Sequence, residues 1–198
     1  NVNCVPNDLE GLVHRFGYLS MTPHRQLFLG GARSGKSSLA EQSAKASGLG
    51  VVYVATAEVK DVDAAGSMQQ RIALHQQRRP AQWRLVEQPL ELSQTLARLD
   101  EAPCCVLVDC LTLWLSNHLC ANTGDFDLVL DQLVQQVSHT QHQLILVSNE
   151  VGSGIVPMGE LSRQFQDYSG LMNQRLAQVC DEVTLVVAGL PLPLKQST

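Results

Sequence analysis

Aromatic residues are scarce in this chain of 198 residues, at 5% of the total. This scarcity excludes the interleaved aromatic platforms on which single-stranded nucleic acids stack. Basic residues are also few, since 14 Lys and Arg stand against 19 Asp and Glu, for a formal net charge of −5. We therefore expect no nucleic-acid partner, although a local basic pocket is still allowed.

Long hydrophobic runs are missing as well. The longest candidates, such as Cys104–Val108 and Leu144–Val147, have the length of strands, whereas a membrane helix needs about 20 apolar residues. The first residues of the chain also lack the charged and apolar regions of a secretory signal. We predict no membrane span and a cytoplasmic location.

Paired cysteines are absent too. The chain has six cysteines, but no two of them form a Cys-X-X-Cys pair with zinc-ligand spacing. Cys104, Cys105 and Cys110 lie inside or beside an apolar run. We interpret the cysteines as small core residues in a reducing compartment.

Hydrophobic residues make up 44% of the chain, which is enough for a folded core. Residues 1–20 show neither helical nor strand periodicity, and Met21 follows them directly. We expect residues 1–20 to be a leader or extension outside the domain, with a packed N-terminal arm as the alternative. One domain is expected over residues 21–198, because its length is typical of a single domain.

Apolar strands alternate with amphipathic helices along this domain. The expected strands are 27–29, 51–55, 83–86, 104–109, 144–148 and 183–188, and the expected helices are 37–47, 63–77, 90–99, 111–119, 126–141 and 161–179. We take 183–188 as the last strand, because Pro191 and Pro193 cannot pair in a central strand. Leu161, Phe165, Leu176 and Val179 are the expected core stripe of the last helix.

A glycine-rich segment between the first strand and the first helix fits the pattern G-x-x-x-x-G-K-[ST]. It consists of Gly30, Gly31, Ala32, Arg33, Ser34, Gly35, Lys36 and Ser37. In such a loop the backbone N–H groups surround phosphate oxygens, the lysine reaches the outer phosphates and the serine hydroxyl binds Mg²⁺. The alternative, an ordinary turn with a solvated lysine, does not require this complete pattern. The segment predicts a nucleoside triphosphate site in a P-loop NTPase-like α/β domain, with a mostly parallel sheet and helices on both faces.

Two carboxylates follow buried strands, where open α/β sheets place their ligands. Asp109 ends the strand 104–109 and is our candidate for the second Mg²⁺ ligand, beside Ser37. Its alternative role is to cap the helix that follows. Glu150 comes directly after the strand 144–148 and its Asn149, and has a similar position.

The residues that fill these positions resemble one family. Four segments match the sequence pattern of this family in the same order: the glycine-rich loop, the strand segment 53–57, the segment 71–80 followed by Trp83, and the segment 149–157. The match continues through Arg163, Asn173 and Asp181. From Leu27 to about Lys195 the chain resembles the bifunctional cobinamide kinase / cobinamide-phosphate guanylyltransferases of cobalamin synthesis.

The resemblance implies two reactions in one subunit. A kinase phosphorylates adenosylcobinamide with ATP or GTP, and a transferase then moves GMP from GTP onto adenosylcobinamide phosphate, releasing pyrophosphate. It also implies a homotrimer. The implied nucleotide-binding positions, beyond the glycine-rich loop, are Ala55, Thr56, Ala57, Gln76, Gln77, Arg78, Arg79, Glu87 and Asp109.

His75 is the predicted nucleophile of the transferase. A neutral imidazole attacks phosphorus readily near neutral pH and can carry a nucleotide covalently. Arg78 and Arg79 follow within one helical turn and could neutralise phosphate charge. The residues alone also fit a surface histidine on a polar helix, and the resemblance to the family's guanylylation segment favours the nucleophile.

Two other functions share the glycine-rich loop. A small-molecule kinase without transferase activity would need Lys36 and Ser37 but not His75. A nucleotide-dependent switch or assembly ATPase would bind nucleotide and leave cobinamide unchanged. The segment 149–157 disfavours both, because neither function needs that sequence.

Overall fold

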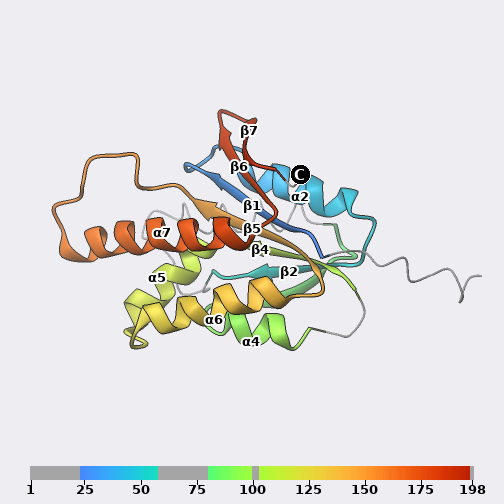
Figure 1. The fold of residues 1–198 in the computed structure, drawn as a ribbon, viewed down its shortest axis with the longest axis horizontal. Coiled ribbons are helices and arrows are strands. Elements are labelled where there is room, and N and C mark those ends of the chain that lie inside the picture. Colours follow the sequence, from blue (N-terminus) through green and yellow to red (C-terminus); the bar gives the residue numbers. More distant parts are fainter. Residues whose placement is uncertain (1–22, 58–79, 100–102, 197–198) are drawn as a thin grey trace, which may run out of the picture.

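The computed structural model describes residues 23–57, 80–99 and 103–196 (Figure 1). Residues 1–20 and the expected helix 63–77 lie outside these ranges. The strands are β1 (Arg25–Gly30), β2 (Val51–Ala55), β3 (Arg84–Glu87), β4 (Cys105–Asp109), β5 (Gln143–Asn149), β6 (Glu182–Val187) and β7 (Leu190–Lys195). The helices are α2 (Lys36–Ala46), α4 (Leu92–Ala97), α5 (Leu111–Ala121), α6 (Phe126–His139) and α7 (Glu160–Val179).

The strands form one sheet in the order β3-β2-β4-β5-β1-β6-β7. Every neighbouring pair is parallel except β6 and β7, which are antiparallel. The predicted mostly parallel sheet is therefore confirmed. β1 leads into the glycine-rich loop, and β4 ends at Asp109. These two strands are not direct neighbours, because β5 lies between them.

Helices cover both faces of the sheet, as predicted (Figure 1). Alternate residues of each central strand face opposite sides, because side chains alternate along a strand. In β4, Val106 and Val108 pack with the core under α4, α5, α6 and α7. Cys105 and Leu107 pack with Ala40 of α2 on the other face. Both faces of β4 are buried, which explains why its sequence is continuously apolar.

The cysteines mostly belong to this interior, as we interpreted them. Cys105, Cys110 and Cys180 are buried, whereas Cys120 is exposed on α5. Burial raises the pKa of the Cys105 thiol to about 11 and that of the Cys180 thiol to about 12. These two thiols therefore stay protonated and poorly nucleophilic near neutral pH.

Two details of the prediction are wrong. The strand 183–188 is not the last one, because β7 follows it and contains Pro191 and Pro193. β7 lies at the edge of the sheet and has a neighbouring strand on one side only. A proline, which lacks an N–H group, is tolerated there because no strand on the outer side needs that donor. Leu161 is 55% exposed rather than part of the core. A helix of 20 residues is about 30 Å long, so the start of α7 extends past the shorter strands, as Figure 1 shows.

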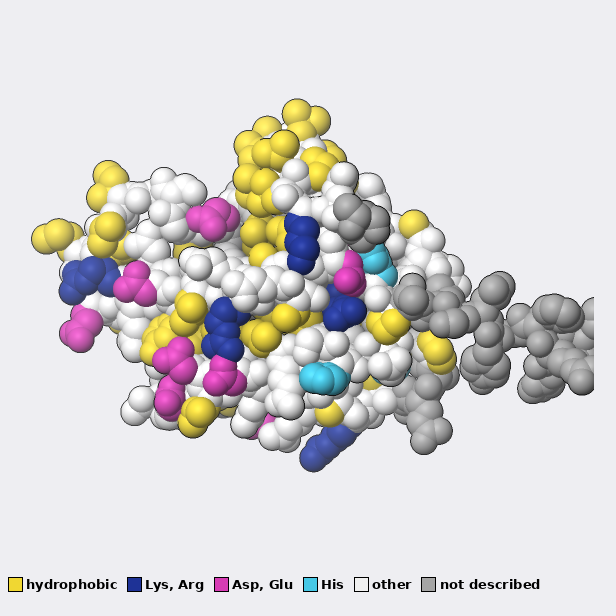
Figure 2. Space-filling view, in the orientation of Figure 1, with side chains coloured by type: hydrophobic (Ala, Val, Ile, Leu, Met, Phe, Trp, Pro, Cys, Tyr) yellow, Lys and Arg dark blue, Asp and Glu magenta, His cyan; other side chains and the backbone are white. Residues whose placement is uncertain are grey.

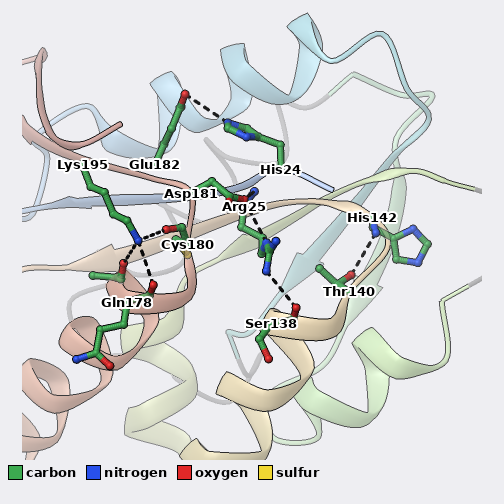
Figure 3. A network of polar contacts seen from close by, with 11 residues as sticks. His24, Arg25, Ser138, Thr140, His142, Gln178, Cys180, Asp181, Glu182 and Lys195 are labelled. Atoms are coloured by element: carbon green, nitrogen blue, oxygen red, sulfur yellow. Dashed lines mark hydrogen bonds and ion pairs between the residues drawn. The ribbon is translucent and has the colours of Figure 1, made fainter. Parts of the chain in front are cut away.

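Polar contacts connect neighbouring segments at the edge of the sheet where the parallel strands begin and β7 ends (Figure 3). The Arg25 side chain donates from Nε to Asp181 Oδ2 at 3.1 Å and from Nη1 to the Ser138 carbonyl at 3.0 Å. The Lys195 ammonium donates to the carbonyls of Ala177, Gln178 and Cys180, at 3.0, 3.0 and 2.6 Å. Lys195 therefore binds the carbonyls at the C-terminal end of α7, which carries partial negative charge.

Lys195→Met is expected to lower the free energy of unfolding by about 1–2 kcal/mol, because three carbonyls lose a charged donor and the helix end loses a cation. Urea unfolding of both proteins measures this difference. Lys45→Met is the matched control, since Lys45 is exposed and its ammonium lies 6.0 Å from the Trp83 ring centre. Equal losses in the two variants would contradict a specific role for Lys195.

Candidate active site

The glycine-rich loop leaves β1 and packs against the turn between β6 and β7. A Cβ atom at Gly30 would lie 2.5 Å from the Val186 carbonyl oxygen, so no larger residue fits there. Gly35 has a φ of +97°, and a Cβ atom there would lie 3.2 Å from Gly189 Cα. The Gly189 N–H donates to the Ser34 carbonyl at 2.8 Å. The two glycines are therefore required by close packing and by backbone conformation.

The loop ends at the N-terminus of α2, which begins at Lys36. Gly35 at the N-cap has no side chain, and the first turn of α2 holds no acidic residue. The N-terminal N–H groups of a helix attract anions, because they carry partial positive charge. Lys36 is buried, and its Nζ donates to the Gly31 carbonyl at 3.1 Å. Lys36 and half-buried Ser37 thus stand at a helix end of the kind that attracts anions.

The structure brings three of the predicted residues together at the carboxyl ends of the strands. Ala55, the last residue of β2, pairs with Asp109 of β4 on one side and with Glu87 of β3 on the other. Gly30 pairs with Asn149 of β5 at the same edge. Since β5 intervenes, the axes of β1 and β4 are about 10 Å apart. Predicted phosphate-binding and carboxylate residues therefore occupy one edge of the sheet.

Asp109 is held by a buried tyrosine. The Tyr53 hydroxyl donates to Asp109 Oδ2 at 3.3 Å. Burial raises the pKa of the Tyr53 phenol, and the Asp109 and Glu41 carboxylates raise it further, so Tyr53 stays a neutral donor. The N-cap of α5 is Cys110. Asp109 lies one residue before that position, so it is not the N-cap residue that the alternative role required.

Lys36 and the end of β4 lie within electrostatic reach of each other. Burial and the Asp109 carboxylate raise the pKa of the Cys110 thiol, while the Lys36 ammonium partly opposes this rise. Cys110 follows Asp109 directly, so the lysine of the loop acts on the segment that carries the carboxylate.

The chain resembles known proteins over nearly all of this structure. A family model described as cobinamide kinase / cobinamide phosphate guanyltransferase matches residues 26–194. The chain belongs to this family. It is 52% identical over 172 residues to the bifunctional adenosylcobalamin biosynthesis protein CobP of Pseudomonas aeruginosa, with 86% of this chain and 97% of that protein covered. It is 38% identical over 184 residues to the bifunctional adenosylcobalamin biosynthesis protein CobU of Salmonella typhimurium, with coverages of 85% and 98%.

A solved structure from Pyrococcus horikoshii, a structural study of the protein PH0250, shares the fold. Its TM-score is 0.53 at 12% sequence identity, over 96% of this chain and 92% of that one. This chain has a P-loop NTPase-like α/β fold, as its glycine-rich loop and its mostly parallel sheet indicate. Among the described residues, no helix has the length and apolar character to cross a membrane.

Some predicted residues have other contacts than expected. The Thr56 side chain is fully buried, and its hydroxyl donates to the Cys110 carbonyl at 2.7 Å and accepts from the Cys110 N–H at 3.0 Å. Thr56 therefore fixes the connection between β4 and α5 in this family member. The Glu150 carboxylate accepts from the Gly152 N–H at 2.6 Å, while the Glu150 N–H donates to the Gly30 carbonyl at 3.0 Å. The predicted residues His75, Gln76, Gln77, Arg78 and Arg79 lie outside the described residues.

Tyr53 and Asn149 were not singled out as site residues from the sequence. Tyr53 stands within an apolar strand, and its hydrogen bond to Asp109 of the neighbouring strand β4 is evident only in the folded structure. The Asn149 side chain donates to Thr112 Oγ1 at 2.7 Å, and its carbonyl accepts from Asn173 Nδ2 at 3.3 Å. Asn149 is a polar residue at the carboxyl end of a buried strand, and this pattern in a sequence indicates a candidate site residue.

The oxygen donors at this edge fit Mg²⁺. Within the described part of the chain, no three His, Cys, Asp or Glu side chains group as metal ligands. The protein would offer the Ser37 hydroxyl and the Asp109 carboxylate, which suits an ion that keeps waters and takes its other ligands from nucleotide phosphates. Bound there, Mg²⁺ would neutralise charge on those phosphates.

Asp109→Asn is expected to raise the Mg²⁺ concentration needed for half-maximal turnover on the order of tenfold, because an amide is a weaker ligand for a hard cation. Metal titration of the kinase reaction measures the shift. Asp127→Asn, at an exposed position in the first turn of α6, removes the same charge as a control. Coinciding titration curves of parent and Asp109→Asn would exclude Asp109 from the metal site.

Proposed function

We propose that this enzyme phosphorylates the hydroxyl of adenosylcobinamide with ATP or GTP and then transfers GMP from GTP onto adenosylcobinamide phosphate. The family match over residues 26–194 carries the proposal. The loop at the start of α2 and the carboxylate of Asp109 support the nucleotide chemistry of both steps.

In the kinase step, the acceptor hydroxyl oxygen bonds to the γ-phosphorus and loses its proton to water. The bond between the γ-phosphorus and the bridging oxygen breaks, so that the nucleoside diphosphate leaves. The loop N–H groups and Lys36 face the phosphates, where negative charge increases in the transition state. Lys36 must exchange its bond to the Gly31 carbonyl for the phosphates. Ser37 and Asp109 would hold Mg²⁺.

In the transferase step, a ring nitrogen of His75 bonds to the α-phosphorus of GTP and pyrophosphate leaves. A phosphate oxygen of adenosylcobinamide phosphate then attacks the same phosphorus, the P–N bond breaks, and adenosylcobinamide-GDP forms. Arg78 and Arg79 neutralise charge on the phosphates, and Ala55, Ala57 and Glu87 line the nucleotide site. Ala55 and Glu87 are neighbours in the sheet, which supports this grouping.

We further propose a homotrimer. The exposed edge strand β7 supports association between copies, because Leu190, Leu192 and Leu194 are each more than half exposed and hydrophobic atoms gather over this hairpin (Figure 2). Light scattering is expected to give three times the chain mass of 21.6 kDa.

The test of the proposed function is incubation with adenosylcobinamide, GTP and Mg²⁺, followed by mass measurement of the products. We expect adenosylcobinamide phosphate and then adenosylcobinamide-GDP, with release of pyrophosphate. Phosphorylation without the GDP product would indicate a kinase alone. Unchanged adenosylcobinamide would contradict both activities.

A further inference from the structure

A cavity of about 370 Å³ lies between α5, the loop 150–159 and the first turns of α7. Its size is in the range of small-molecule sites. None of the lining residues is Asp, Glu, Lys, Arg or His: they are Ser116, Leu119, Cys120, Val151, Ile155, Pro157, Leu161, Ser162, Phe165 and Gln166. The phosphates of a nucleoside triphosphate need cationic side chains or clustered N–H donors, and this lining contains no cationic side chain. The cavity is therefore suited to a neutral ligand that has apolar groups and a few hydrogen-bonding ones.

The protein's own hydrogen bonds hold the walls of the cavity in place. Gln166 Nε2 of α7 donates to the Val151 carbonyl at 3.1 Å. Arg163 of α7 donates to the carbonyls of Pro157 and Met158, at the other end of the loop. The Glu150 carboxylate binds the Gly152 N–H. Because the loop is attached to α7 at two points, a ligand would find much of the cavity already formed.

The loop connects this cavity directly to the phosphate-binding loop. The Glu150 N–H donates to the Gly30 carbonyl at 3.0 Å, and the next residue, Val151, is part of the cavity wall. A ligand in the cavity therefore lies beside the nucleotide site without occupying it.

A polar stripe on α7 leads from the cavity towards the same edge. Ser162, Gln166, Ser169 and Asn173 follow each other at intervals of four, three and four residues, which places them on one side of the helix. Asn173 reaches the carbonyl of Asn149, the partner of Gly30 in the sheet. In the described part of the chain, buried Ser148 Oγ, Ser169 Oγ and Asn173 Oδ1 have no hydrogen-bond partner. Such fully buried atoms are ones that an ordered water can satisfy.

We propose that this cavity binds one side of the corrin ring system of the acceptor, and so places the acceptor hydroxyl towards the phosphate-binding loop. The inference rests on the proposed function. A corrin ring carries methyl groups and uncharged amides, which match a lining of apolar side chains with Ser116, Ser162 and Gln166. The ring is larger than the cavity. Ile155 of the lining is 96% exposed, and the nearby Met158, 95% exposed, extends the apolar surface of the loop beyond the cavity. Figure 2 shows hydrophobic side chains over this loop, at the left of the view.

Two variants at exposed positions of the lining test the proposal. Ser162→Trp fills part of the cavity, and Leu161→Glu places a charge in it. We expect each to raise the KM for adenosylcobinamide, and its Kd measured by equilibrium dialysis, at least about tenfold. The Kd for GTP is expected to stay within about twofold of the parent value. Leu128→Glu is the control, because Leu128 is a similarly exposed leucine on α6, at 61%.

The outcomes separate the two proposals. If the parent protein neither binds nor phosphorylates adenosylcobinamide, the proposed function fails and this inference with it. If the parent is active and both variants keep its KM and Kd, the function stands and the cavity is not the acceptor site. If either variant instead lowers the molecular mass of the assembly while its KM is unchanged, the surface is an interface between copies, which also overturns the proposal. Melting temperatures near that of the parent show that the variants are folded.

Discussion

GTP labelled at the α-phosphorus is expected to tag the parent protein covalently, and His75→Ala is expected to abolish both the tag and the adenosylcobinamide-GDP product. An imidazole that attacks the α-phosphorus keeps that atom and releases the β and γ phosphates as pyrophosphate. GTP labelled at the γ-phosphorus should therefore leave the protein untagged. The P–N bond should break in acid and survive mild alkali.

The same variant separates the two activities. Phosphorylation of adenosylcobinamide by ATP is expected to persist in His75→Ala, because that step transfers phosphate directly to the hydroxyl. His139→Ala is the control, since His139 is an exposed histidine at the end of α6. Acid-labile α-label on His75→Ala would identify another nucleophile. Equal loss of kinase activity in a folded variant would instead give His75 a role in nucleotide binding.

Lys36→Ala is expected to lower the kinase rate about 100-fold or more, because the ammonium group compensates negative charge on the transferring phosphate. Steady-state kinetics with ATP and adenosylcobinamide measure the loss. Lys45→Ala removes the same charge from the other end of α2 and is expected to keep near-parent activity. Both variants should be checked for a melting temperature close to that of the parent, because Lys36 is buried and contacts the Gly31 carbonyl.

Near-parent kinase activity of Lys36→Ala would mean that the loop 30–37 does not bind the phosphate donor. That outcome would contradict a phosphate-binding role for the N-terminus of α2, where Lys36 follows the N-cap residue Gly35. A moderate loss with an unchanged KM for ATP would locate the effect in the transition state rather than in binding.

The elements of the central sheet could be predicted closely from the sequence. Expected strands at 51–55 and 104–109 correspond to β2 and β4, and the expected helix 126–141 corresponds to α6. Apolar periodicity identifies such elements, because a buried strand or helix face needs apolar residues at regular intervals along the chain. The same reasoning failed at the ends of the fold. Leu161 has the periodicity of a core residue but extends past the sheet, and β7 contains prolines that only an edge strand tolerates.

The sequence by itself was enough to predict the part of the site that is formed by residues adjacent in the chain. The loop from Gly30 to Ser37 could be predicted as a phosphate site from its own glycines, lysine and serine and the helix that follows. Its packing against Val186 and Gly189 could not. The identity of these residues, with segments such as 149–157, also determined the family.

Only the tertiary structure decided how distant residues meet. The strands β1, β2, β4 and β5 are all short and apolar, so their sequences do not specify which of them are neighbours. Their packing puts β5 between β1 and β4, sets Ala55 between Glu87 and Asp109, and brings the Tyr53 hydroxyl to the Asp109 carboxylate. It also places the neutral cavity beside the phosphate loop, since the lining comes from α5, the segment after β5 and α7. These contacts arise from long-range packing of similar elements, which a local pattern does not encode.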